Sequence, residues 1–156
     1  MPREYGAPPK VQAEKLGDYL EVMSKAVFQS GISWTVIEKK WPTIREALRG
    51  FEPMAVASLT EAELEALTKD TRVIRNRRKL EAIVDNARQM VELDDQHKGF
   101  REYLRSHGGF EPTVADLRKR FRFMGELGCF YFLYVVDEPV PEYEDWCKSR
   151  GIEHRH

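Results

Sequence analysis

One apolar stripe constrains the fold of this chain more than any other feature of its sequence. Apolar residues recur at helical intervals through the middle of the chain, at Leu80, Ile83, Val84, Ala87, Met90 and Val91. Such a row lies on one face of an α-helix and has to be buried against other parts of the chain. The stripe therefore predicts a long central helix, with the remaining elements packed around it.

The other apolar patterns also have helical spacing, so the predicted fold class is all-α. The stretch over 129–136 could also form a buried strand, but no partner strand is evident, and we predict a helix there. We expect Val36 and Ile37 to face inward in a helix over 34–40, and Pro42 to begin a separate one. Further helices are expected over 11–27, over 53–57, from a Thr60–Glu63 capping box, over 100–108, over 114–121 after a Thr113 cap, and over 141–151 with Tyr143 and Trp146 inward.

Composition narrows the class of protein. A chain of 156 residues is expected to form a single domain, with residues 154–156 as a disordered tail. Its 25 Lys and Arg against 26 Asp and Glu give a net charge of −1, which argues against non-specific coating of nucleic acid; a polyanion would need a local basic patch. Cys129 and Cys147 have neither disulfide-framework nor zinc-site spacing, and no apolar run is long enough to span a membrane. We expect a cytoplasmic protein without a bound metal.

A glycine interrupts the helical pattern between two aromatic residues. We call residues 28–34 (FQSGISW) the glycine tip, because Gly31 allows a positive φ and hence a tight reversal of the chain. A protruding Ile32 beside Gln29 and Trp34 could separate stacked bases in a duplex. The alternative is that Phe28, Ile32 and Trp34 are ordinary core residues at a helix end.

Two basic clusters offer a local patch for a polyanion. Five cations stand at the entrance of the central helix, although a helix start prefers negative charge; a second group stands before a break at residues 121–125, which we call the hairpin. A glycine-bearing turn between two helices exposes backbone N–H groups that can hold a phosphate. The alternatives are a solvated basic face and a plain helical corner. The cations are Arg72, Arg75, Arg77, Arg78 and Lys79 in the first cluster, and Arg118, Lys119, Arg120 and Arg122 in the second.

Three blocks taken together resemble the constitutive 3-methyladenine DNA glycosylases, members of the helix-hairpin-helix glycosylase superfamily. The blocks are the glycine tip, the segment 74–87 and the hairpin, and the similarity runs from about Glu4 to Val136. The segment Tyr5-Gly6-Ala7-Pro8 also resembles the family's Trp-Gly-Val-Pro. The resemblance implies two helical lobes around a cleft, and an enzyme that flips a damaged purine such as 3-methyladenine out of duplex DNA and hydrolyses its N-glycosidic bond, without a cofactor.

The resemblance also implies roles for individual residues. Gln29, Gly31 and Ile32 would enter the gap left by the flipped nucleotide. Trp34 and Tyr5 would line the base pocket, where aromatic faces favour a cationic base over neutral adenine by about 0.5–2 kcal/mol per contact. The remaining predicted DNA-binding residues are Arg75, Arg77, Phe123 and Gly125.

A catalytic residue is not assigned. Asp137 lies too close to the hairpin to match the catalytic aspartate of other superfamily members, and we interpret Asp137 and Glu138 as surface residues at a helix end.

Several departures from the family pattern keep other functions open. Ala26 stands where the family has a glutamate that contacts the base, and the family's Tyr-His element would fall at or before Met1. Glu142 and Trp146 stand near the places of a histidine and a cysteine that complete the family's zinc site, which predicts a zinc-free variant. The alternatives are a non-catalytic module that binds bent or damaged DNA, and a structural or protein-interaction domain.

Overall fold

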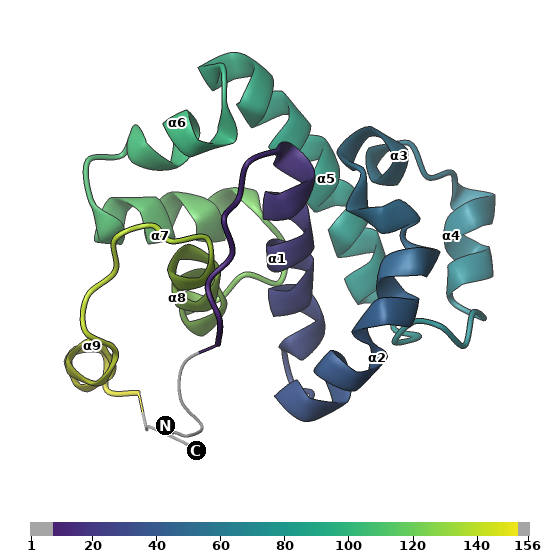
Figure 1. Ribbon diagram of the computed structural model, residues 1–156, viewed down its shortest axis with the longest axis horizontal. Helices are drawn as coiled ribbons and strands as arrows, with labels where there is room; N and C mark the ends of the chain where they lie inside the picture. Colours follow the sequence, from purple (N-terminus) through teal and green to yellow (C-terminus); the bar gives the residue numbers. More distant parts are fainter. Residues whose placement is uncertain (1–7, 153–156) are drawn as a thin grey trace.

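The computed structural model describes residues 8–152, and over this range the chain forms helices and no strand (Figure 1). Tyr5 and the tail at 154–156 lie outside the described residues. The elements are α1 (Leu16–Gln29), α2 (Trp34–Ala47), a 3₁₀ turn η1 (Arg49–Phe51), α3 (Pro53–Ala57), α4 (Glu61–Leu67), α5 (Arg77–His97), α6 (Phe100–Arg105), α7 (Phe110–Arg120), α8 (Glu126–Val135) and α9 (Tyr143–Arg150). The predicted all-α fold class is confirmed.

The long helix α5 is the axis of the molecule, as its apolar stripe predicts. Asn76 starts it by accepting a hydrogen bond from the Lys79 N–H, and Lys98 ends it in the left-handed conformation. Helix α5 packs against α1, α3, α4 and α6. In Figure 1, α2 to α4 lie on one side of α1 and α5, and α6 to α9 lie on the other, so the two predicted helical lobes are present.

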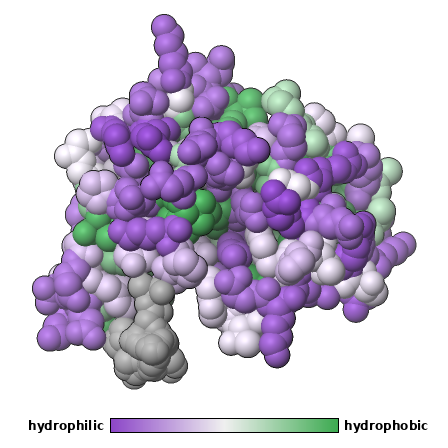
Figure 2. All heavy atoms as spheres, viewed as in Figure 1, coloured by the Kyte–Doolittle hydropathy of each residue, from purple (hydrophilic) through white to green (hydrophobic). Residues whose placement is uncertain are grey.

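One apolar core joins the two lobes. It contains Leu80, Ile83 and Met90 from α5, together with fully buried aromatic residues such as Phe28 and Phe132. The face drawn in Figure 2 is largely hydrophilic, with a few small hydrophobic areas. None of the helices in the described part of the chain is long and apolar enough to cross a membrane.

The structure contradicts the helix starts predicted at Pro42 and after Thr113. Pro42 lies inside α2, which runs unbroken from Trp34 to Ala47. A proline inside a helix costs about 3 kcal/mol. The preceding residue, Trp41, is buried and stacks on Phe51 with ring centroids 5.3 Å apart, and packing of this kind stabilises the helix at this position. Helix α7 begins at Phe110, before Thr113, whose hydroxyl donates to the carbonyl of Gly109 instead of accepting a capping bond.

Predictions about single residues and helix ends are partly confirmed and partly wrong. Ile37 is fully buried, whereas Val36 is 48% exposed, because neighbouring helix positions point about 100° apart and the buried face of α2 is too narrow here to include both. The Thr60–Glu63 capping box is present, and Gly151 ends α9 in the left-handed conformation. The last helix starts after Glu142 rather than at Pro141. Residues 126–135 form a helix, so the strand alternative for this segment is excluded.

Candidate DNA-binding face and base pocket

The glycine tip is a tight turn between α1 and α2. Gly31 has a φ of 79°, and a Cβ added there would meet no atom within 4 Å, so backbone conformation and not space favours glycine. The Ile32 N–H donates to the carbonyl of Gln29 at 2.9 Å, and the Ser33 hydroxyl accepts from the Val36 N–H at 3.2 Å. Ile32 is half-buried against the core. The tip is therefore closed by its own hydrogen bonds and leaves part of Ile32 in contact with solvent.

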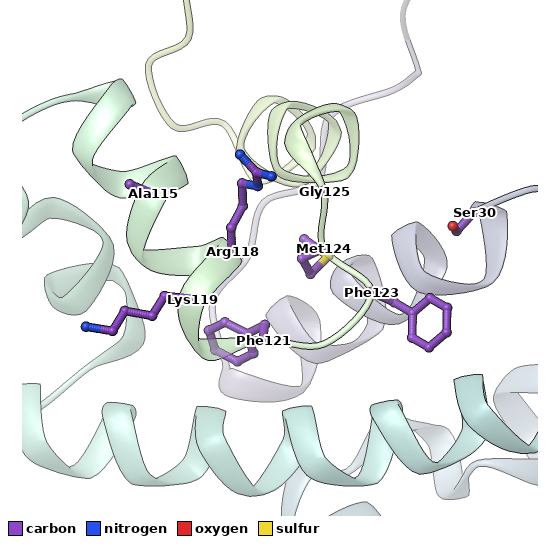
Figure 3. A pocket seen from close by; sticks show the side chains of 8 residues that line it. All are labelled: Ser30, Ala115, Arg118, Lys119, Phe121, Phe123, Met124 and Gly125. Carbon is purple, nitrogen blue, oxygen red and sulfur yellow. The ribbon is translucent and has the colours of Figure 1, made fainter.

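The glycine tip and the hairpin line the same hollow. Its volume is about 570 Å³, and its walls include Ser30 from the tip and Phe123, Met124 and Gly125 from the hairpin. In Figure 3, Phe123 projects from the hairpin towards the side on which Ser30 lies. A Cβ added to Gly125 would meet nothing within 4 Å. These two segments are distant in sequence, and α5, α7 and α8 bring them together.

The cations that line or border this hollow differ in what they can still bind. Arg118 and Lys119 line it and make no ion pair with a described residue, whereas their neighbours are occupied. Arg120 contacts Asp116 at 2.9 Å, and Arg122 contacts Asp85 at 2.6 Å. Arg118 and Lys119 are therefore the cations of the second cluster that are available to a phosphate.

Two of the five cations in the first cluster are occupied by carboxylates. Arg77 makes three ion pairs, with Glu61, Glu65 and Glu81. Arg72 makes ion pairs with Asp70 and Glu46.

Two other arginines of the first cluster are free to bind. Arg75 and Arg78 are exposed and form no ion pair within residues 8–152. The sequence prediction named Arg75 and Arg77 together as DNA-binding residues, although the carboxylates of α4, spaced four positions apart, were a signal for the pairing of Arg77.

Lys79 fits neither predicted alternative for the first cluster. Its side chain is buried, because it stands four positions before Ile83 on the apolar face of α5. Its ammonium group donates to the carbonyls of Phe28 and Ser30, in the glycine tip. Burial lowers the pKa of Lys79 below its ordinary value.

Trp34 stands at the other side of the tip and is 37% exposed. Its ring meets the ring of Tyr131 edge-on, with centroids 5.9 Å apart, and the Lys25 ammonium lies 5.6 Å from its centroid. Lys25 also contacts Glu38 at 2.9 Å. Sequence reasoning missed Tyr131, Lys25 and Glu38, because nothing in their local spacing links them to Trp34.

Polar groups behind Trp34 are sheltered from water. Burial raises the pKa of Tyr131 above its ordinary value, so its hydroxyl stays protonated. The contact with Gln29 lowers this pKa, but its effect is smaller than that of burial. The Gln29 amide nitrogen is buried and has no hydrogen-bond partner within residues 8–152. An unpaired buried donor is costly unless something else satisfies it. Ala26 is buried close to Gly128, so position 26 of α1 carries no carboxylate.

The end of α8 corrects one expectation and supports another. Asp137 adopts a left-handed conformation with φ 65°, is largely exposed, and contacts Lys10 at 3.0 Å, as a surface residue would. Glu138 was expected at the surface but is buried, where it binds Arg105 at 3.1 Å. Its N–H donates to the carbonyl of Leu133, and this reversal after the helix turns its side chain inward.

The residues near the expected zinc ligands have other roles. Trp146 is buried against Phe130, with ring centroids 4.8 Å apart, and Glu142 caps α9. Cys129 and Cys147 are free thiols in the interior, and burial raises the pKa of Cys129 to about 12. Within residues 8–152 no group of three or more His, Cys, Asp and Glu side chains is arranged to hold a metal ion.

The arrangement of the helices is that of a known class of DNA repair fold. One solved structure of 3-methyladenine DNA glycosylase I has a TM-score of 0.72 to this chain at 23% identity, covering 82% of this chain and 81% of that one. Another, the Staphylococcus aureus enzyme described with its recognition of 3-methyladenine, has a TM-score of 0.71 at 24% identity, covering 83% and 79%. The fold therefore places the chain in the class of helical DNA glycosylase folds.

Sequence similarity narrows the class to one family. The chain matches the methyladenine glycosylase family over residues 3–126 and belongs to it. The DNA-3-methyladenine glycosylase of Haemophilus influenzae is 29% identical, over 84% of this chain and 80% of that protein. DNA-3-methyladenine glycosylase 1 of Escherichia coli K12 is 28% identical, over 83% and 79%. The predicted family resemblance is confirmed.

Proposed function

We propose that this protein is a DNA glycosylase that flips an alkylated purine such as 3-methyladenine out of duplex DNA and hydrolyses its N-glycosidic bond. The observation that carries the proposal is the shared hollow, because Ser30 of the glycine tip and Gly125 of the hairpin line it together. One duplex can therefore contact both segments at once. Family membership and the names of the relatives support the same reaction.

Each part of the face has a role in this proposal. Gln29, Gly31 and Ile32 would fill the gap that the flipped nucleotide leaves in the stack. The backbone N–H groups of the hairpin around Phe123 and Gly125 would hold a backbone phosphate.

Free cations around these segments would add to the phosphate grip. Arg118 and Lys119 line the hollow beside the hairpin, and Arg75 and Arg78 stand at the start of α5. Neutralising phosphates with Arg and Lys supplies most of the sequence-independent affinity for DNA. The local patch thus reconciles DNA binding with a net charge of −1.

The chemistry fits the residues of the base pocket. A 3-alkylated adenine is cationic and leaves easily, so neither a strong acid nor a protein nucleophile is required, and a water molecule can attack the sugar. Stacking on Trp34, and on Tyr5 outside the described residues, would hold the cationic base. Tyr131 beside Trp34 would form a further wall of this pocket.

Release of free base from methylated duplex DNA tests the proposal. The folded wild-type protein should release 3-methyladenine, and Trp34→Ala should reduce that release by about tenfold or more, because one aromatic wall of the pocket is lost. Circular dichroism and thermal unfolding confirm that the variant is folded. Absence of release above the Trp34→Ala level, with both proteins folded, would overturn the proposed activity.

A non-catalytic module that binds damaged or bent DNA is the second candidate. Ala26, in place of a base-contacting glutamate, favours it. Binding to duplex DNA that weakens steeply with salt, without release of any base, would assign this function. Both candidates act on duplex DNA, and the free buried thiols agree with the cytoplasmic location predicted from the sequence.

A further inference from the structure

Two polar side chains are buried on one face of α5. Lys79 is 4% exposed and Asn86 is 2% exposed. Seven residues make almost two helical turns, so both side chains leave the helix on the same face, about 10.5 Å apart along its axis. Burying polar groups is unfavourable unless they are fully hydrogen-bonded. Their partners therefore show what this face of α5 holds in place.

Lys79 holds the glycine tip. Its Nζ lies 3.0 Å from the carbonyl oxygen of Phe28 and also donates to the carbonyl oxygen of Ser30. These carbonyls belong to the last turn of α1 and its cap, where the negative end of the helix dipole favours a cation. Helix α1 has no basic residue in its own last turn. Lys79 supplies that charge from α5, without an ion pair to any described carboxylate.

Asn86 holds the hairpin. Its Oδ1 accepts a hydrogen bond from the Arg122 N–H at 2.8 Å, and its Nδ2 donates to the Arg122 carbonyl oxygen at 3.1 Å. Both backbone groups of the residue before Phe123 are thus satisfied by one side chain. The neighbouring Asp85 contacts the Arg122 guanidinium at 2.6 Å. The hairpin is therefore fixed to α5 at a single backbone position.

The two held segments line the same hollow. Lys79 contacts the carbonyl of Ser30, and Ser30 is one wall; Asn86 contacts the backbone next to Phe123, which is another. A duplex rises about 3.4 Å per base pair along one strand, so the spacing of the two side chains along α5 corresponds to about three base pairs. Enzymes that act on a base take the target nucleotide out of the stack, so the two held segments would act on nearby parts of one strand.

We propose that Lys79 and Asn86 are positioning residues that fix the glycine tip and the hairpin at a set spacing along α5, so that phosphate gripping at the hairpin and base flipping at the tip occur in register. Neither side chain touches the DNA in this scheme. The inference rests on the proposed function, because it assigns the two segments to the two ends of one flipping event. It adds the residues that couple them.

Single-turnover release of 3-methyladenine and the fluorescence of 2-aminopurine placed beside a tetrahydrofuran abasic site test the coupling. The variants are Lys79→Met, Asn86→Leu and their combination. Each single variant should bind undamaged duplex within about threefold of wild type, yet release base at least about tenfold more slowly and lose the 2-aminopurine fluorescence increase. The combined variant should be no slower than the slower single variant, because breaking either end already destroys the register.

Controls separate positioning from stability. Ile83→Val removes a buried methyl group between Lys79 and Asn86 without touching either contact, and should keep the wild-type rate per folded molecule. If Lys79→Met or Asn86→Leu does not fold, Lys79→Arg and Asn86→Asp replace them, because they keep part of each contact. A smaller 2-aminopurine fluorescence increase at unaltered duplex affinity then supports the positioning role. Wild-type fluorescence and wild-type rates in the folded variants, or losses that multiply in the combined variant, would overturn the inference.

The two proposals fail in different ways. If the wild-type protein releases no base, the proposed function fails, but the abasic duplex needs no base release and its fluorescence still tests the positioning role. If wild-type release is normal and the variants behave like wild type, only the positioning role fails.

Discussion

Ala26 is the residue at which we expect the base selectivity of the proposed pocket to be set. Ala26 is buried in α1, and its Cβ lies 3.9 Å from the place that a Cβ on Gly128 would occupy. Gly128 has no side chain, so a longer side chain at position 26 would extend over Gly128 towards Met124. The Met124 sulfur lies 3.8 Å from the place that a Cβ on Gly128 would occupy. The absence of a carboxylate at position 26 removes an attraction for a cationic base, and we expect this position to control selectivity.

Ala26→Glu should speed release of cationic 3-methyladenine but not of neutral hypoxanthine. A charge-assisted contact contributes about 1.5–3 kcal/mol, which corresponds to about tenfold or more in rate. Single-turnover rates on the two substrates measure the effect, and Ala26→Gln is the matched control, since it has the same length without the charge. Equal acceleration by Gln, or acceleration on both substrates, would contradict an electrostatic origin.

At the scale of the element, the end of α7 contains neighbouring arginines with different environments. Arg118 lines the hollow without an ion pair to a described residue, whereas Arg120 is bound to Asp116. Both belong to the last turn of the same helix. They form a natural comparison between a cation that is free to meet phosphate and one that serves the fold.

Arg118→Gln should weaken duplex binding and reduce the slope of log affinity against log salt concentration by about 0.9, the amount expected for one lost phosphate contact. Titration of a fluorescent duplex at several salt concentrations provides the measurement. Arg120→Gln should leave that slope unchanged. If both variants give the same slope, the hollow is not a phosphate site.

A cluster around Asp116 joins α6 to α7. Its carboxylate accepts hydrogen bonds from the Tyr103 hydroxyl at 2.6 Å and from Arg120 at 2.9 Å, and lies 3.0 Å from the His107 ring. Burial acts to raise the pKa of Asp116, but the hydrogen bonds from Tyr103, His107 and Arg120 outweigh it, and the pKa lies below its ordinary value. The ionised carboxylate therefore stabilises the contact between these helices.

Asp116→Asn should lower the free energy of unfolding by about 1–3 kcal/mol near neutral pH, because the hydrogen bonds lose their charged acceptor. A lowered pKa in the folded state gives stabilisation that is complete above the ordinary value of 3.8 and is lost as pH falls through the folded value. Urea unfolding of both proteins between pH 7 and pH 2 should show the difference shrinking below about pH 4. A constant difference across this range would exclude the charge as its cause.

At the scale of the whole molecule, α9 attaches the C-terminal end of the described chain to α7 and α8. Trp146 from α9 packs on Phe130 from α8 and meets Phe110 from α7, with ring centroids 4.8 and 6.1 Å apart. Buried aromatic contacts of this kind stabilise a fold without any bound ion. We expect this aromatic cluster to hold α9 in place in the zinc-free variant that the sequence predicts.

Trp146→Ala should lower the free energy of unfolding by about 3–5 kcal/mol, as expected when a large buried aromatic side chain is deleted. Treatment of the wild-type protein with EDTA should leave its melting temperature unchanged. Thermal unfolding with and without chelator, together with elemental analysis for zinc, measures both effects. A drop in melting temperature on chelation, restored by zinc, would show that a metal holds this segment instead.

Much of this protein could be predicted from its sequence, because its main signals are local. The stripe from Leu80 to Val91 specifies α5, Gly31 specifies a reversal, and the Thr60–Glu63 box specifies a helix start. Helical periodicity and capping depend on residues three or four positions apart, so they can be read without knowing the fold. The three blocks in their order were also sufficient to indicate the family that the comparisons confirm.

Only the tertiary structure decided which groups are available at the candidate site. Arg77 and Arg75 look alike in the sequence, but α4 brings carboxylates to Arg77 and none to Arg75. Lys79 reads as a surface cation, yet α1 ends against it, and Tyr131 reaches Trp34 across 97 positions of sequence. The physical reason is that ion pairing and burial depend on neighbours in space, which are set by how the helices pack and not by the order of residues along the chain.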